Sequence, residues 1–262
     1  MTVEQQTKKR VMLTVAYDGT GYCGWQIQPN GISVQSVLDR YLSSFLGEEI
    51  RVQGASRTDA GVHAQGNVAI FDTVSRMPAD RISFAMNARL PEDIRIMDSR
   101  EVPLSFHPRF TNTIKTYEYR ICNRTFPDPC RRLYTLFYHW PLDENKMQQA
   151  ADALTGEHDF TSFCTDRPEI KNHTRTIYTL KVTRQGDEVI IRITGNGFLY
   201  NMVRIIVGTL LRIGGGLMEP DEMKKTLEAK NRALAGDTAR PEGLTLVSIR
   251  YPDEPFADEG RF

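Results

Sequence analysis

The stretch of sequence that decides the fold is Gly54-Ala-Ser-Arg-Thr-Asp-Ala-Gly-Val-His-Ala-Gln-Gly-Asn-Val-Ala-Ile-Phe-Asp72. Its first half sets polar and charged side chains among small residues, as tight turns do. Its second half runs into Val68, Ile70 and Phe71, a pattern typical of a β-strand. We therefore predict a polar turn that leads directly into a strand. Such a turn can present a side chain to a cleft, although a solvated surface loop has the same pattern.

Strands and helices are expected on both sides of this stretch. In the first half we predict strands over 11–17, 50–53, 67–72 and 94–102, a helix capped by Ser33, and a helix over 79–90. In the second half we predict strands over 116–122, 134–139, 175–183, 188–195 and 245–251, and helices over 143–154 and 199–212. This order favours an α+β fold of two ferredoxin-like βαββ-type halves, 1–105 and 106–262. We expect their antiparallel sheets to form a continuous core with a central cleft.

Composition is that of a globular protein. Hydrophobic residues make up 40% of the chain, and 33 basic residues balance 33 acidic ones. A net charge of zero gives no overall attraction to nucleic acid, so an RNA partner would need a local basic face. The most apolar stretch, 198–213, is shorter than the roughly 20 residues of a membrane span and contains two arginines. We expect a buried core helix there and no contact with a membrane.

Several kinds of site are disfavoured by the motif content. The four cysteines form no Cys-x-x-Cys pair and the five histidines are scattered, which argues against zinc and favours free thiols in the cytoplasm. The polar segment 1–10 lacks the apolar run of a signal peptide. The glycine-rich stretch 17–30 lacks both the Gly-Lys-Ser/Thr and the Gly-x-Gly-x-x-Gly patterns. A nucleotide cofactor is therefore not expected.

Asp59 is the first candidate for chemistry. No second carboxylate lies in its loop, so a pair of acids for general acid–base catalysis is not indicated. Arg57 and His63 are close in sequence, and a nearby cation favours the ionised carboxylate. That suits a nucleophile or an anion that stabilises positive charge. The alternative is structural: the carboxylate of Asp59 caps the turn or pairs with Arg57.

Two further positions carry possible functional side chains. Tyr117 and Tyr119 share one face of a predicted strand, where they could stack on a nucleobase or simply fill the core. Arg204 lies in the middle of the predicted apolar helix, where a charge needs a partner. Asp59 is a candidate for that partner. A structural pair with another acid, or a head group that reaches water, would serve equally well.

Taken in order, these segments resemble the TruA family of tRNA pseudouridine synthases. The matching motifs are Tyr17-Asp-Gly-Thr-x-Tyr-x-Gly-Trp-Gln-x-Gln-Pro-Asn, Ser56-Arg-Thr-Asp-Ala-Gly-Val-His63, Phe106-His-Pro-Arg-Phe110, Lys115-x-Tyr-x-Tyr119, His158-Asp-Phe-Thr-Ser-Phe163 and Gly197-Phe-Leu-Tyr-Asn-Met-Val-Arg204. They extend over nearly the whole chain, and their order and spacing make the resemblance specific.

The resemblance implies an isomerase that converts uridine to pseudouridine at positions 38, 39 and 40 of the tRNA anticodon stem-loop. It implies a homodimer that uses no metal and no organic cofactor, and it makes the central cleft catalytic. Asp59 would be the nucleophile and Arg204 its cationic partner. Arg57 would occupy the space of a flipped-out uridine and Tyr117 would stack on it. His63 and Leu199 are expected to contact the substrate, and Lys8 to Arg10, Arg76, Arg81 and Arg89 are candidates for a basic face.

Two other functions are compatible with parts of the pattern. A catalytically silent RNA-binding protein could keep the fold, but it would have no need of Arg57, Asp59, Tyr117 and Arg204 together. A hydrolase of glycosidic bonds would need a second acid near Asp59, and the local sequence offers none. The tRNA isomerase is therefore the function we expect.

Overall fold

The computed structural model describes residues 7–165 and 170–254, which divide into two units. Unit 1 contains residues 7–112 together with 246–254, and unit 2 contains residues 113–245. The predicted halves, 1–105 and 106–262, differ from these units at the C-terminal end. Most of the last strand, from residue 246 onward, belongs to unit 1.

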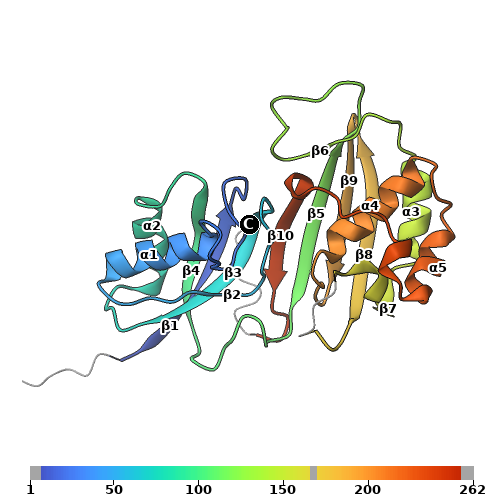
Figure 1. Cartoon of the computed structure of the whole chain (residues 1–262). Coiled ribbons are helices and arrows are strands. Elements are labelled where there is room, and N and C mark those ends of the chain that lie inside the picture. Colours follow the sequence, from blue (N-terminus) through green and yellow to red (C-terminus); the bar gives the residue numbers. More distant parts are fainter. Residues whose placement is uncertain (1–6, 166–169, 255–262) are drawn as a thin grey trace, which may run out of the picture. The chain divides into compact units, whose positions relative to one another are not determined.

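Unit 1 follows a βαββαβ order (Figure 1). Its elements are β1 (Lys9–Tyr17), α1 (Val34–Leu46), β2 (Gln53–Gly54), β3 (His63–Thr73), α2 (Ala79–Asn87) and β4 (Ile94–Val102), joined by most of β10 (Leu244–Arg250). The strand order is β4-β1-β3-β10, with β2 also paired to β3. β1 runs antiparallel to both β3 and β4, and α2 packs on β4.

Unit 2 combines further, mostly antiparallel, strands with helices (Figure 1). Its elements are β5 (Ile114–Cys122), β6 (Leu136–Phe137), α3 (Glu144–Asp152), β7 (Gly156–Asp159), β8 (Thr174–Gln185), β9 (Glu188–Gly195), α4 (Met202–Gly214) and α5 (Glu222–Ala229), with short 3₁₀ turns at Thr161–Phe163, Arg232–Leu234 and Pro241–Gly243. The strand order is β5-β9-β8-β7, and the short β6 lies parallel to β5. The predicted mixed α+β architecture with antiparallel sheets is confirmed.

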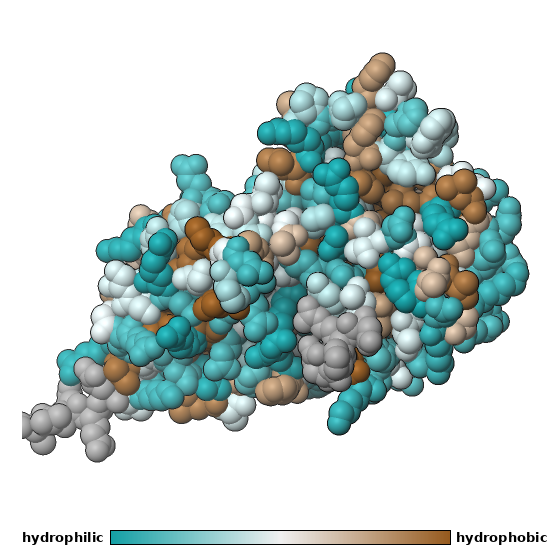
Figure 2. Space-filling view, viewed as in Figure 1, coloured by the Kyte–Doolittle hydropathy of each residue, from teal (hydrophilic) through white to brown (hydrophobic). Residues whose placement is uncertain are grey.

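Each unit buries its own apolar side chains. Trp25, Leu13 and Phe71 are fully buried in unit 1, and Phe160 and Phe163 in unit 2. On the face drawn in Figure 2, hydrophilic side chains predominate and apolar ones form small groups. The burial of the large apolar residues is the main favourable term in folding.

The first helix begins where the sequence predicts. The Ser33 hydroxyl accepts a hydrogen bond from the Ser36 amide, and the Ser36 hydroxyl accepts one from the Ser33 amide. This reciprocal pair satisfies two amides at the helix start. Gly47 ends the helix with φ of 68°, a left-handed conformation that glycine adopts without strain.

Two predicted strands are wrong over most of their length. Of 50–53, only Gln53 pairs within the sheet, because α1 binds the preceding backbone: the Ile50 amide donates to the Ser43 hydroxyl and the Val52 amide to the Asp39 carboxylate. Of 134–139, only 136–137 form a strand, since Asn123 binds the carbonyl groups that follow them. In both segments, hydrogen bonds to side chains elsewhere in the chain thus replace the sheet hydrogen bonds that the β-branched and aromatic residues had led us to expect.

Helix α4 is the predicted core helix but starts three residues later than expected. Asn201 precedes it with φ of 60°, so the regular helix begins at Met202. Eleven of its thirteen residues are buried. Among the described residues, none of the helices combines the length and the apolar character that a membrane crossing requires.

Candidate active site

Asp59 lies in a turn that joins β2 to β3 in unit 1. The Val62 amide donates to the Asp59 carbonyl (3.1 Å), and Gly61 has φ of 78°, which closes the turn. Within it the residues alternate in exposure: Arg57 is exposed, Thr58 is buried and Asp59 is half-buried. The predicted turn leading into a strand is confirmed.

A buried polar network lies beneath this turn. The Tyr17 hydroxyl is 2.7 Å from the Thr58 hydroxyl and accepts a hydrogen bond from the Asn67 amide group. The same Asn67 side chain bonds both the amide and the carbonyl of Ser56, at 3.3 and 3.1 Å. All four residues are buried, and Asn67 is 0% exposed. Because buried polar groups are costly to leave without partners, this network fixes the residues on either side of Arg57.

The glycine-rich segment that follows β1 supports the turn from the other side. The Trp25 amide donates to the Thr58 carbonyl at 3.0 Å. A Cβ atom added to Gly24 would lie 2.5 Å from the same carbonyl oxygen, and one added to Gly19 would lie 2.1 Å from that of Val62. These two glycines therefore permit close backbone packing against the Asp59 turn. The sequence excluded a phosphate loop here but did not reveal this contact.

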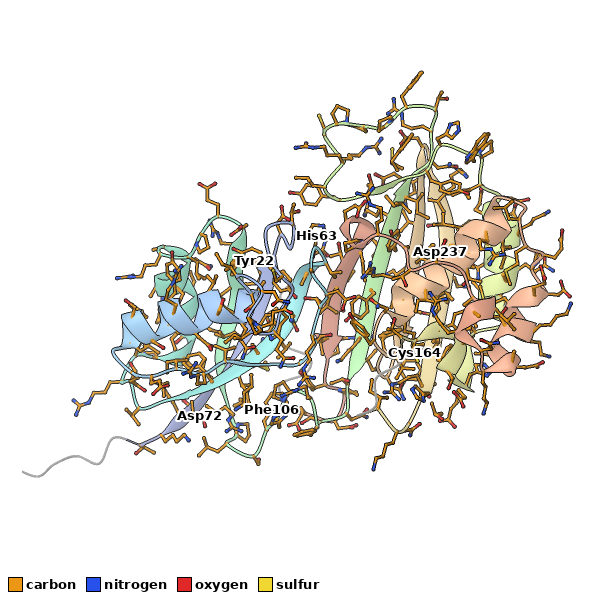
Figure 3. The ribbon with its side chains drawn as sticks, in the orientation of Figure 1. Tyr22, His63, Asp72, Phe106, Cys164 and Asp237 are labelled. Carbon is orange, nitrogen blue, oxygen red and sulfur yellow. The ribbon has the colours of Figure 1, made fainter. Side chains whose placement is uncertain are left out.

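His63 is buried at the start of β3 (Figure 3). Its Nδ1 atom accepts a hydrogen bond from the Gly19 amide at 3.1 Å and lies 3.2 Å from a carboxylate oxygen of Asp18. These contacts attach the glycine-rich segment to β3 and support a structural role for the ring. Contact between His63 and a substrate remains a prediction.

Two arginines, Arg57 and Arg109, place positive charge beside the Asp59 turn. Arg57 is exposed, and Arg109 lies close enough for the two charges to interact: partial burial of the Arg109 guanidinium, followed by the charge of Arg57, lowers the pKa of Arg109. Neither guanidinium has an acidic partner within residues 7–165 and 170–254. By contrast, Lys8 and Arg10, from the predicted basic face, both pair with Asp72.

In unit 2, Tyr117 and Tyr119 project from the same strand but have different surroundings. Tyr119 is fully buried, and its hydroxyl donates to the Arg240 carbonyl at 2.6 Å. Burial raises the pKa of this hydroxyl far above its ordinary value. The rings of Tyr117 and Phe198 are nearly perpendicular in an edge-to-face contact, with ring centres 5.2 Å apart. Tyr119 is thus a structural residue, and Tyr117 belongs to an aromatic pair.

Arg204 lies in the first turn of α4 and not in its middle, because the helix starts at Met202. Its Nε atom donates to the Ala239 carbonyl (2.6 Å), while the Ala239 amide donates to the Arg204 carbonyl (3.1 Å). Nη1 also donates to the Asn201 side chain at 3.1 Å. These bonds to neutral oxygen atoms hold the guanidinium in one orientation.

The predicted site residues are divided between the two units. Arg57, Asp59 and His63 come together on the β2–β3 turn and the start of β3 in unit 1. Tyr117, Leu199 and Arg204 belong to unit 2, where Leu199 is buried in the segment between β9 and α4. Phe198, which sequence reasoning did not single out, connects that segment to Tyr117. Its place inside the quoted Gly197–Arg204 motif was the available signal.

No group of three or more potential metal ligands occurs among the residues that the structure describes. The four cysteines are thiols and not disulfides.

Comparison with known proteins gives the family. The chain matches the model of the tRNA pseudouridine synthase family over residues 13–111 and 150–252. The tRNA pseudouridine synthase A of Brevibacillus brevis is 47% identical over 243 residues, which cover 93% of this chain and 100% of that protein. The protein of the same name from Halalkalibacterium halodurans is 48% identical over 237 residues, 90% of each chain. A crystal structure of a Cbf5-Nop10-Gar1 complex aligns with 77% of this chain and 45% of its own, at 15% identity and a TM-score of 0.37.

The chain therefore belongs to the tRNA pseudouridine synthase family, whose members are isomerases. The likeness to two proteins named tRNA pseudouridine synthase A confirms the resemblance to the TruA group that the motifs indicate.

Proposed function

We propose that this protein isomerises uridine to pseudouridine at positions 38, 39 and 40 of the tRNA anticodon stem-loop, with Asp59 as the nucleophile. The observation that carries the proposal is the turn of Asp59. Its carboxylate is half-buried, next to an exposed arginine, on backbone that a buried hydrogen-bond network holds in place. A side chain carried on backbone that is held in place is pre-organised for attack on a bound nucleotide.

Access to a base within a stem requires the nucleotide to flip out, which costs a few kcal/mol. Arg57 is exposed next to Asp59 and has a long side chain suited to occupying the vacated space. Arg109 adds a second cation nearby. Two neighbouring guanidinium groups without acidic partners in the described chain attract the phosphates that flank the flipped nucleotide.

Tyr117 receives the flipped uracil by stacking and takes part in the proton movement that completes the reaction. The edge contact with Phe198 restrains its ring. Leu199, in the same segment, supplies apolar contact. The uracil detaches from its sugar, rotates and rejoins through carbon, so atoms are neither added nor removed and no redox or group-carrying cofactor is needed.

Arg204 pairs with Asp59 and favours its ionised form. The bonds from Arg204 to Ala239 and Asn201 orient its guanidinium group, and an oriented guanidinium is suited to a charge-assisted hydrogen bond with a carboxylate. We further propose that the protein acts in the cytoplasm as a homodimer.

Wild-type protein incubated with an anticodon stem-loop that carries uridine at positions 38, 39 and 40 tests this function. Position-resolved detection of pseudouridine should find conversion at these three positions. Conversion should persist in EDTA. A protein that binds the stem-loop and leaves every uridine unchanged would be the silent RNA-binding protein instead.

The pairing of Arg204 with Asp59 has a separate test. Arg204→Leu should greatly reduce turnover and move the acid limb of the pH–rate profile to higher pH, because a carboxylate without its cation is protonated more readily. Arg192→Gln, which removes an exposed arginine of β9 from its pair with Glu118, is the control. A pH–rate profile of Arg204→Leu that overlays the wild-type profile contradicts the pairing.

A further inference from the structure

Arg175, near the start of β8, is a half-buried arginine without an acidic partner among the residues that the structure describes. Its Nη1 atom donates to the carbonyl groups of Asn172 (3.1 Å) and Thr174 (2.6 Å). No other hydrogen bond of this guanidinium is found within the described residues, so Nε and Nη2 keep their donor capacity. Burial lowers the pKa of Arg175, as expected for a charge that is partly removed from water.

The other arginines on the strands of unit 2 are different. Arg192 pairs with Glu118, Arg184 with Glu144, and Arg120 with both Glu118 and Glu188. These three balance their charges inside unit 2. Because a partly buried cation without a counter-ion is unfavourable, the stability of the strands does not explain the charge of Arg175.

The segment beside Arg175 is the one that leads to the aromatic pair. A Cβ atom added to Gly197 would lie 3.7 Å from Nε of Arg175. The next residue, Phe198, makes the edge contact with Tyr117. Two hydrogen bonds attach this segment to β8 directly after Arg175: the Thr176 amide donates to the Asn196 side chain (2.9 Å), and the Asn196 amide donates to the Thr176 carbonyl (3.0 Å).

We propose that Arg175 binds a backbone phosphate of the RNA, next to the nucleotide that stacks on Tyr117. Guanidinium groups bind phosphate with two parallel hydrogen bonds, and Nε with Nη2 form the edge that suits this geometry. The carbonyls of Asn172 and Thr174 orient the group from its opposite side. This role rests on the proposed function, since it assigns a contact for the same substrate.

The salt dependence of tRNA binding by Arg175→Gln tests the contact. Each protein–phosphate contact contributes about 0.7 to 0.9 to the slope of log affinity against log salt concentration. Arg175→Gln should reduce the slope by about that amount, and it should raise KM about tenfold with little change in kcat. Arg192→Gln removes the same charge from the same sheet and should leave the slope and KM unchanged.

Arg175→Lys separates charge from geometry. It should keep the slope of the wild-type protein while raising KM, because an ammonium group binds phosphate without the paired hydrogen bonds. Asn172 and Thr174 are exposed, so water can replace the bonds that their carbonyls lose, and melting temperatures should stay close to wild type.

A slope and KM for Arg175→Gln equal to those of wild type would overturn the proposal. So would a loss of affinity that Arg192→Gln reproduces. The conversion assay on the wild-type protein distinguishes a failure of this phosphate contact from a failure of the proposed function. An active wild type with an unchanged slope in Arg175→Gln contradicts this contact alone, whereas an inactive wild type contradicts the proposed function.

Discussion

At the scale of single residues, Asp59 owes its position to groups far away in the chain. The hydroxyl groups of Tyr17 and Thr58 meet across 41 residues, and Asn67 bonds Tyr17 across 50. The polar turn itself is visible in the sequence because its pattern is local. The network beneath it was not predicted, because contacts between distant residues leave no periodic pattern.

Tyr17→Phe removes the hydroxyl at the centre of this network and keeps the ring that packs on Trp25. Thr58 and Asn67 each lose a buried partner, so we expect a loss of stability of about 1–3 kcal/mol. We also expect kcat to fall more than KM rises, since the turn that positions Asp59 loosens. Chemical denaturation and steady-state kinetics measure the two effects.

Tyr41→Phe is the matched control for this prediction. Tyr41 is half-buried on α1 in the same unit, and its hydroxyl has no hydrogen-bond partner among the described residues. Its removal should change neither quantity. Equal kinetics for Tyr17→Phe and Tyr41→Phe would mean that the network does not position the site.

At the scale of elements, local signals determined what could be predicted. The capped helix α1 and the strand β4 were predicted at their starts because caps and alternation lie within the segment itself. The region before β2 was misassigned since Asp39 and Ser43 of α1 bind its backbone. For the same reason the support that the glycine-rich segment gives to the Asp59 turn appeared only in the structure.

Gly24→Ala should disturb the site through that contact. Its φ of 85° disfavours any side chain, and the new Cβ atom would lie 2.5 Å from the Thr58 carbonyl. We expect a loss of stability of about 1–2 kcal/mol from the backbone strain alone. The displaced turn should also reduce kcat by about tenfold or more.

Gly47→Ala is the control that introduces backbone strain without displacing a neighbouring segment. Gly47 also has a positive φ, 68°, but an added Cβ atom meets nothing within 4 Å. This variant should lose comparable stability and retain its kcat. If both variants have wild-type kcat, the glycine-rich segment does not hold the Asp59 turn.

At the scale of the whole molecule, the net charge is zero, but acidic partners are distributed unevenly among the basic residues. Asp72 neutralises Lys8 and Arg10, while Arg57, Arg109 and Arg175 have no acidic partner in the described chain. Composition alone predicted no attraction to RNA. A few arginines without acidic partners are enough to attract RNA, because attraction to phosphates depends on local charge.

Acid stability tests another of these charge pairs. Lys230, followed by Thr161, lowers the pKa of Asp159 to about 2 from 3.8. A carboxyl group with a lowered pKa stabilises the fold above its unfolded pKa, and this stability is lost as the pH falls through the folded pKa. Between about pH 5 and pH 2, wild type should therefore lose more stability than Asp159→Asn. Asp80→Asn, an exposed control, should follow the wild-type curve in urea denaturation.

The central claim is that Asp59 is the nucleophile of a tRNA isomerase, and Asp59→Asn tests it most directly. The variant keeps the size of the side chain and removes its charge, and Asp80→Asn on α2 is the matched control. Pseudouridine in the anticodon stem-loop and tRNA affinity are measured for both. We predict that Asp59→Asn binds tRNA with nearly wild-type affinity and forms no pseudouridine, while Asp80→Asn remains active. Pseudouridine formation by Asp59→Asn at the wild-type rate would contradict the account.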